Sequence, residues 1–197
     1  DGILLVTPYY NKGTQNGLIK HYTTITEEAK VPAILYNVPS RTGCSLAAST
    51  VAYLAKNAEY VTAIKEASGD ISHVADIMYA CDGAIDLYSG NDDQIVPILS
   101  LGGKGVISVL SNVAPKETHD IVALFLEGKI KESRELQLKA LPLVHALFSE
   151  VNPIPVKAAL NLMGKEVGPL RLPLTEMEAA HQEVLVEEMK KFGIKLA

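Results

Sequence analysis

The strongest constraint on how this chain can fold is a repeated alternation of short apolar runs with longer segments of helical period. Five runs are rich in branched residues and apolar almost throughout, as strands buried on both faces are. These runs are Ile3–Thr7, Ala33–Val38, Val61–Ala67, Ile85–Ser89 and Gly105–Leu110. Strands and helices in regular alternation predict an α/β fold with a parallel sheet.

Helices are predicted between and after these runs, from their periodicity and from residues that commonly begin or end helices. Ser45 is expected to cap one helix and either Asp70 or Ser72 another, and Pro115 fits the first turn of a third. The expected helices are Gly17–Ala29, Leu46–Lys56, Asp70 or Ser72 to Cys81, Asp92 or Asp93 to Gly102, and Pro115 to about Gly128. Beyond Gly128 no strand is predicted, and Lys129–Glu150, Pro155–Met163 and Thr175–Phe192 are expected to be helical.

Two architectures fit this pattern, a doubly wound sheet and a (β/α)8 TIM barrel. No G-x-G-x-x-G motif follows the first run, which weakens the dinucleotide-binding alternative. Polar residues instead gather where the predicted strands end, as in barrel enzymes. We therefore expect residues 1–128 to be the C-terminal part of a TIM barrel and residues 129–197 to form an α-helical C-terminal region.

Composition and charge exclude several classes of protein. The formal net charge of -5 argues against a nucleic-acid binder, whose surface would carry a basic stripe. No run approaches the roughly 20 apolar residues of a membrane-spanning helix. Cys44 and Cys81 share no metal-like spacing, which predicts free thiols and a cytoplasmic location.

Lys65 is the residue most suggestive of chemistry. It shares one face of its predicted strand with small apolar residues, so its amine should lose water on folding. Desolvation lowers the pKa of an amine, and an uncharged amine can attack a carbonyl group. A structural lysine paired with a carboxylate is the alternative, but the neighbouring Glu66 should point to the opposite face.

Two further side chains gain meaning beside Lys65. Tyr36 lies one strand earlier, so its hydroxyl could meet the amine and move protons; a core tyrosine is the alternative. Arg41 follows in a turn at the same end of the sheet, where a guanidinium suits a substrate carboxylate, although most loop arginines are merely solvated. The histidines show no metal-ligand spacing, and Asp92-Asp93 fits helix capping better than a metal site.

Six motifs follow one another along the chain. They are Thr7-Pro8-Tyr9-Tyr10-Asn11, Tyr36-Asn37-Val38-Pro39-Ser40-Arg41-Thr42-Gly43, Ile64-Lys65-Glu66-Ala67, Ser89-Gly90-Asn91-Asp92, Gly105-Val106-Ile107-Ser108 and Asn152-Pro153-Ile154-Pro155-Val156-Lys157. In order and spacing they resemble the 4-hydroxy-tetrahydrodipicolinate synthase family, which belongs to the pyruvate Schiff-base aldolases, as does N-acetylneuraminate lyase. Together the six motifs span nearly the whole chain.

The resemblance implies condensation of pyruvate with aspartate 4-semialdehyde through an imine on Lys65, in lysine and diaminopimelate biosynthesis, with no metal or other cofactor. It implies that Tyr36 shuttles protons and that Arg41 holds the semialdehyde carboxylate. Tyr10 would complete a proton relay across a subunit interface of a homotetramer, a dimer of dimers. Two further expectations are that Gly90 and Ile107 line the pyruvate pocket and that Tyr9 lies near the interface cleft where lysine inhibits some members of the family.

One departure from the family is what precedes the first motif. The chain opens without Met, inside a predicted strand, and its five strands match the fourth to the eighth of the family barrel. We therefore expect a further N-terminal barrel segment, carrying a threonine pair that binds pyruvate. Two alternatives remain: another pyruvate aldolase, of the N-acetylneuraminate or keto-deoxy-sugar type, and a non-catalytic barrel relative.

Overall fold

Five parallel strands form one sheet, in the order in which they occur along the chain. They are β1 (Ile3–Val6), β2 (Ala33–Asn37), β3 (Val61–Glu66), β4 (Asp86–Ser89) and β5 (Gly105–Val106). Each lies within a predicted apolar run. β5 ends earlier than Leu110 because the Ser108 hydroxyl accepts a hydrogen bond from the Ser111 amide and turns the chain into a short 3-10 helix, η2 (Leu110–Asn112).

The computed structural model describes residues 1–197, and these form two compact units, residues 1–107 and residues 108–197. From the sequence, the boundary between the barrel part and the helical region was predicted after Gly128, where the last strand–helix repeat ends. The two divisions differ because the helix after β5, α6 (Pro115–Leu126), packs against α7 (Ile130–Leu147) in the second unit.

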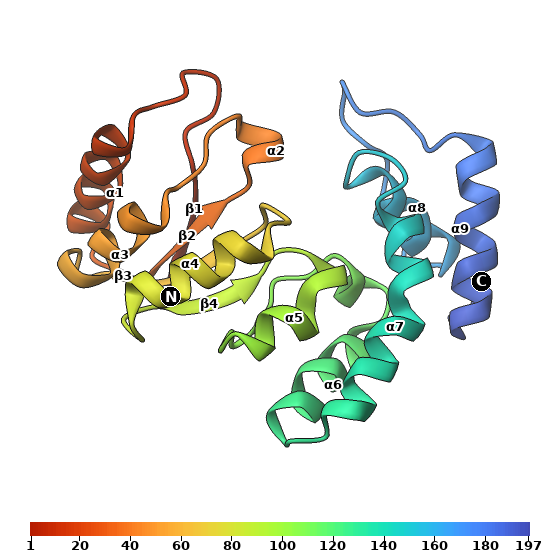
Figure 1. The fold of residues 1–197 in the computed structure, drawn as a ribbon. Helices are drawn as coiled ribbons and strands as arrows, with labels where there is room; N and C mark the ends of the chain where they lie inside the picture. Colours follow the sequence, from red (N-terminus) through yellow and green to blue (C-terminus); the bar gives the residue numbers. More distant parts are fainter. The chain divides into compact units, whose positions relative to one another are not determined.

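Helices of the first unit cover one face of the sheet (Figure 1). They are α1 (Gln15–Ala29), α3 (Ala48–Asn57), α4 (Ile71–Cys81) and α5 (Ile95–Ser100), the last preceded by a 3-10 turn, η1 (Asp92–Gln94). Leu35, Ile64 and Leu87 are register partners on β2, β3 and β4 and are fully buried in the core under these helices. The opposite face therefore carries the next residue of each strand.

Helix ends confirm one predicted cap and correct another. The Asp70 carboxylate accepts hydrogen bonds from the Ser72 and His73 amides and caps α4, as predicted. The prediction for Ser45 was wrong, because α3 begins only at Ala48. Gln15 of α1 replaces the local cap: its Oε1 accepts from the Ala47 amide and from the Thr50 hydroxyl. A short helix that was not predicted, α2 (Pro39–Thr42), follows β2.

The second unit is helical, as predicted for residues after Gly128. It contains α6, α7, α8 (Ile154–Leu162) and α9 (Ala179–Phe192), and α7 packs against both α6 and α9. Leu143 and Leu147 of α7 meet Leu185 and Met189 of α9 in its apolar core. No helix of the chain has both the length and the apolar character needed to span a membrane.

Candidate functional site

Three neighbouring strands bring Tyr36, Lys65 and Tyr88 into register on the face of the sheet opposite the helices. Tyr36 is the Cα partner of Lys65, and Lys65 that of Tyr88. Side chains of directly paired residues on adjacent strands lie about 5 Å apart at their bases, so these three can touch. The strand register thus places the predicted nucleophile between two tyrosines on neighbouring strands.

The environment of Lys65 lowers the pKa of its amine below that of a free lysine. Burial lowers the pKa of its amine, the Asp92 carboxylate opposes that shift, and the Arg41 guanidinium reinforces it. No carboxylate forms an ion pair with the amine. Because the uncharged form is the nucleophile, this environment prepares Lys65 to attack a carbonyl carbon.

Tyr36 meets Lys65 through its ring. The Lys65 Nζ atom lies 4.2 Å from the centroid of the Tyr36 ring, so the amine is in contact with the face of the ring. Burial raises the pKa of the Tyr36 phenol, and Arg41 acts in the opposite direction. A phenol that keeps its proton beside the amine is suited to proton transfer during imine formation.

Gly90 lies against Lys65 from the neighbouring strand end. A Cβ atom at this position would stand 2.5 Å from the Ala67 Cβ and 3.1 Å from the Lys65 Cε. Its amide donates a 2.7 Å hydrogen bond to the Glu66 carbonyl. Only glycine therefore fits between the end of β4 and the stem of the lysine.

Arg41 stands on α2, in the loop that joins β2 to α3. Its side chain is exposed, and its charge acts on the pKa values of both Lys65 and Tyr36. The structure thus brings Arg41 to the strand end that carries the amine. A cation there can bind an anionic substrate group without neutralising the nucleophile.

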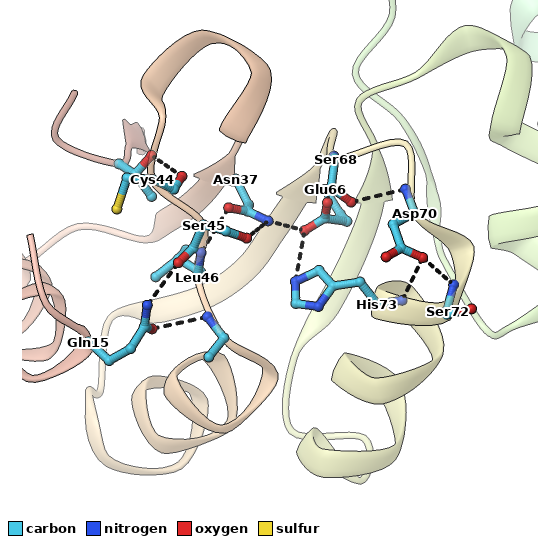
Figure 2. Close-up of polar contacts among 12 residues, drawn as sticks. Gln15, Asn37, Cys44, Ser45, Leu46, Glu66, Ser68, Asp70, Ser72 and His73 are labelled. Atoms are coloured by element: carbon cyan, nitrogen blue, oxygen red, sulfur yellow. Dashed lines mark hydrogen bonds and ion pairs between the residues drawn. The ribbon is translucent and has the colours of Figure 1, made fainter. Parts of the chain in front are cut away.

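Glu66 faces away from Lys65, as predicted from strand alternation. Its side chain is 1% exposed, and Figure 2 shows it bonded to Asn37 of β2 beside Ser68 and His73. Asn37, Glu66 and Ser89 are register partners at the ends of β2, β3 and β4, and all three are buried. The sequence motifs contain these residues, but a buried polar row on the helix side was not predicted.

Asp92 or Asp93 was predicted to cap a helix, and this prediction was wrong: both lie inside η1, whose N-cap residue is Asn91, and the N-cap of α5 is Gln94. The buried carboxylate of Asp92 is the strongest charge that keeps the pKa of Lys65 from falling further. The contribution that the structure shows for Asp92 is therefore electrostatic. Its position shortly after the end of the apolar run was the only sequence signal.

Ile107 and the tyrosine pair lie at the margins of this site. Ile107 follows β5, and its amide donates to the Ser89 carbonyl, which fixes it at the same strand end. Tyr9 and Tyr10 occupy the loop after β1 and are 70% and 89% exposed. Tyr10 has a left-handed backbone, with φ 66°. The chain by itself does not pack Tyr10 against the Lys65 site.

The family comparison agrees with this geometry. The model of the dihydrodipicolinate synthetase family matches residues 1–192. A protein of Lachnoclostridium phytofermentans named 4-hydroxy-tetrahydrodipicolinate synthase is 61% identical over 194 residues, which are 98% of this chain. The match covers 66% of that relative, so this chain spans just under two thirds of the relative's length.

Solved structures give the same result for the fold. Dihydrodipicolinate synthase from Thermotoga maritima superposes with a TM-score of 0.95 at 45% identity, covering 98% of this chain and 66% of that one. The enzyme from Acinetobacter baumannii, solved in complex with pyruvate, superposes with a TM-score of 0.95 at 41% identity, covering 99% and 67%. These likenesses confirm the predicted barrel fold class, with a helical C-terminal region.

Proposed function

We propose that this chain, which belongs to the dihydrodipicolinate synthetase family, carries the lysine nucleophile of a 4-hydroxy-tetrahydrodipicolinate synthase. The reaction would condense pyruvate with L-aspartate 4-semialdehyde in lysine and diaminopimelate biosynthesis. The observation that carries the proposal is the Lys65 amine, which is partly buried, depressed in pKa and free of any carboxylate ion pair, beside Tyr36 and Arg41.

The proposed chemistry begins at the Lys65 Nζ atom. The uncharged amine attacks the C2 ketone of pyruvate, and loss of water gives a protonated imine. Loss of a proton from the methyl carbon gives an enamine, whose carbon forms a bond to the aldehyde carbon of the second substrate. The amino group of that substrate then displaces Lys65 from C2 and closes the ring. The imine nitrogen is the electron sink, so this scheme needs no metal or organic cofactor.

Each neighbour has a role in this scheme. Tyr36 moves protons on and off the carbinolamine, and Arg41 binds the carboxylate of the semialdehyde. Gly90 and Ile107 line the pyruvate pocket through backbone groups. Tyr10 completes the proton relay in the site of a neighbouring subunit, and Tyr9 lies near the interface cleft at which lysine inhibits some members of the family.

We further propose a homotetramer built as a dimer of dimers, working in the cytoplasm. The high exposure of Tyr9 and Tyr10 supports a subunit contact at this loop. The two buried cysteines are free thiols, which suits a reducing compartment. The barrel would extend to residue 128, with its fourth to eighth strands in this chain.

Borohydride trapping tests the proposal on the complete gene product that carries this sequence. Pyruvate and borohydride should add mass to Lys65, and a coupled assay with aspartate semialdehyde should show turnover. Lys65→Ala is expected to abolish the adduct while the melting temperature stays close to that of the parent, since no ion pair is lost. Turnover by that variant at a comparable rate would contradict the proposed role of Lys65.

The same assay separates the rival functions. An adduct on Lys65 without turnover of the semialdehyde would favour a sugar-acid aldolase of the same superfamily. Absence of any adduct would favour a non-catalytic relative. Arg41 supports the synthase, because a short substrate with its own carboxylate suits a guanidinium better than a polyhydroxylated chain does.

A further inference from the structure

Glu66 is a buried carboxylate next to the proposed nucleophile in sequence, yet it faces the other side of the sheet. Removing a carboxylate from water is costly, and an apolar residue of similar size is often no less stabilising. A stability role alone therefore explains this residue poorly. The arrangement of its two oxygens gives a better explanation.

The two carboxylate oxygens bind two different loops. Oε1 accepts a 2.6 Å hydrogen bond from the Ser68 amide, in the loop that follows the Lys65 strand. Oε2 accepts a 2.8 Å hydrogen bond from the Asn37 amide group at the end of β2. His73 of α4 also faces Oε2, at 3.9 Å, which is too long for a hydrogen bond.

Asn37 passes this restraint to the loop that carries Arg41. The loop starts at Val38, the residue after Asn37, and the Asn37 Oδ1 atom accepts a 3.0 Å hydrogen bond from the Leu46 amide at its far end. One side chain therefore ties both ends of the loop (Figure 2). Glu66 accepts from the Nδ2 atom of Asn37 and the Leu46 amide donates to its Oδ1 atom, so these two partners together fix the orientation of the Asn37 amide.

We propose that Glu66 is a positioning residue, whose carboxylate holds the Arg41 loop in place relative to the Lys65 strand through Asn37. The inference rests on the proposed function, in which Arg41 binds the carboxylate of the aldehyde substrate. Loss of the restraint affects binding of that substrate, while pyruvate still reaches Lys65.

The test is a double-mutant cycle that reverses the polarity of the Asn37–Glu66 bond in the complete gene product. Glu66→Gln alone keeps one acceptor oxygen, for either the Ser68 amide or Asn37 but not for both. Asn37→Asp alone removes the donor and places two carboxylates side by side. Combining the two substitutions can restore the bonds to the Ser68 and Leu46 amides and the bond between positions 37 and 66, the last with its polarity reversed. In the double variant, the side-chain amide introduced by Glu66→Gln would donate to the carboxylate introduced by Asn37→Asp and would accept from the Ser68 amide. The carboxylate introduced by Asn37→Asp would also accept from the Leu46 amide. Glu66→Asp, one methylene shorter, provides a second comparison if Glu66→Gln does not fold.

A rise in KM for the aldehyde of about 10- to 100-fold is expected for the single variants, because displacing a binding group by about 1 Å has effects of this size. The yield of pyruvate adduct on Lys65 at saturating pyruvate should stay near that of the parent. The double variant should return KM to within about threefold of the parent, since the hydrogen-bond pattern is whole again. Asp70→Ala, which weakens the α4 cap without touching Asn37, is the matched control: it should lower stability and leave KM unchanged.

Three outcomes would overturn the inference: an unchanged KM in the singles, no recovery in the double, or a rise in KM with Asp70→Ala as large as with Glu66→Gln. Failure of the proposed function would look different. In that case the parent protein itself would form no adduct or would not turn over the semialdehyde.

Discussion

At the scale of single residues, the charge state of Lys65 results from opposed influences. Burial and Arg41 lower the pKa of its amine, and Asp92 raises it. The fraction of uncharged amine at neutral pH therefore depends on a guanidinium whose other proposed task is to bind substrate. Removing that guanidinium should change the pH dependence of the first chemical step as well as substrate affinity.

Arg41→Ala is expected to raise the pKa of Lys65, because a cation that disfavours the ammonium form is lost. Below that pKa the rate of adduct formation follows the uncharged fraction, so its rising limb should move to higher pH. The measurement is the initial rate of pyruvate adduct formation as a function of pH. Arg41→Lys keeps a cation and should keep most of the parent pH profile. A rising limb that moved to lower pH in Arg41→Ala would contradict the assigned effect of Arg41 on the pKa of Lys65.

Gly90→Ala tests how closely β4 approaches the lysine. The added methyl would meet the Ala67 Cβ at 2.5 Å and the Lys65 Cε at 3.1 Å, so the strand ends must separate. Overpacking of this kind costs about 1–3 kcal/mol in the free energy of unfolding, and adduct formation should slow with it. Urea unfolding provides the measurement.

Gly13→Ala is the matched control for Gly90→Ala. A Cβ at Gly13 would find its nearest neighbour at 4.0 Å, so the change should stay within about 0.5 kcal/mol. Equal stability of the two alanine variants would show that Gly90 is not sterically required.

The sequence predicted these residues unequally well. Lys65 and Glu66 were assigned to opposite faces from strand alternation alone, and the structure agrees. Tyr36 was placed beside Lys65, although the amine meets the ring rather than the expected hydroxyl. The influence of Asp92 on Lys65 was missed because it depends on how η1 folds back after β4, which no local pattern encodes.

At the scale of helices and strands, the sequence predicted the end of an element correctly only where the residues that form that end are close together in the chain. Asp70 caps α4 through amides two and three residues away, a relation visible in the sequence. The start of α3 depends instead on Gln15, some thirty residues earlier, so a local reading chose Ser45. The shortening of β5 has a similar origin in side-chain bonding by Ser108.

Asp70→Ala is expected to lower the free energy of unfolding by about 1 kcal/mol, the usual effect of losing an N-cap. Ser72→Ala is its control, because Ser72 contributes its backbone amide and not its hydroxyl to the cap. Urea unfolding of both variants gives the comparison. A loss for Ser72→Ala as large as for Asp70→Ala would mean that the cap is not formed by the Asp70 carboxylate.

At the scale of the whole molecule, the sheet has one well-covered face and two strands paired on a single side, β1 and β5. On the Lys65 face of β1, Leu4 and Val6 are 47% and 39% exposed. Unpaired strand edges and exposed apolar side chains promote association between chains. The helical unit, in contrast, has an apolar core of its own.

Residues 1–197 produced alone should therefore self-associate and show little or no turnover of pyruvate and aspartate semialdehyde. Light scattering and the coupled assay measure the two properties, with the complete gene product as reference. A monomeric, cooperatively unfolding and fully active preparation of residues 1–197 would contradict this expectation.

The adjacency of Lys65 and Glu66 on β3 also limits how this strand can change its length. Inserting or deleting one residue before them would exchange their faces, burying an ammonium group among the helices and moving a carboxylate to the substrate side. One such change would therefore remove both the proposed nucleophile and the proposed positioning residue from their sites. Insertions and deletions in this part of the chain should therefore be confined to the surface loops on either side of β3. A change of length there leaves Lys65 and Glu66 on their present faces of the sheet.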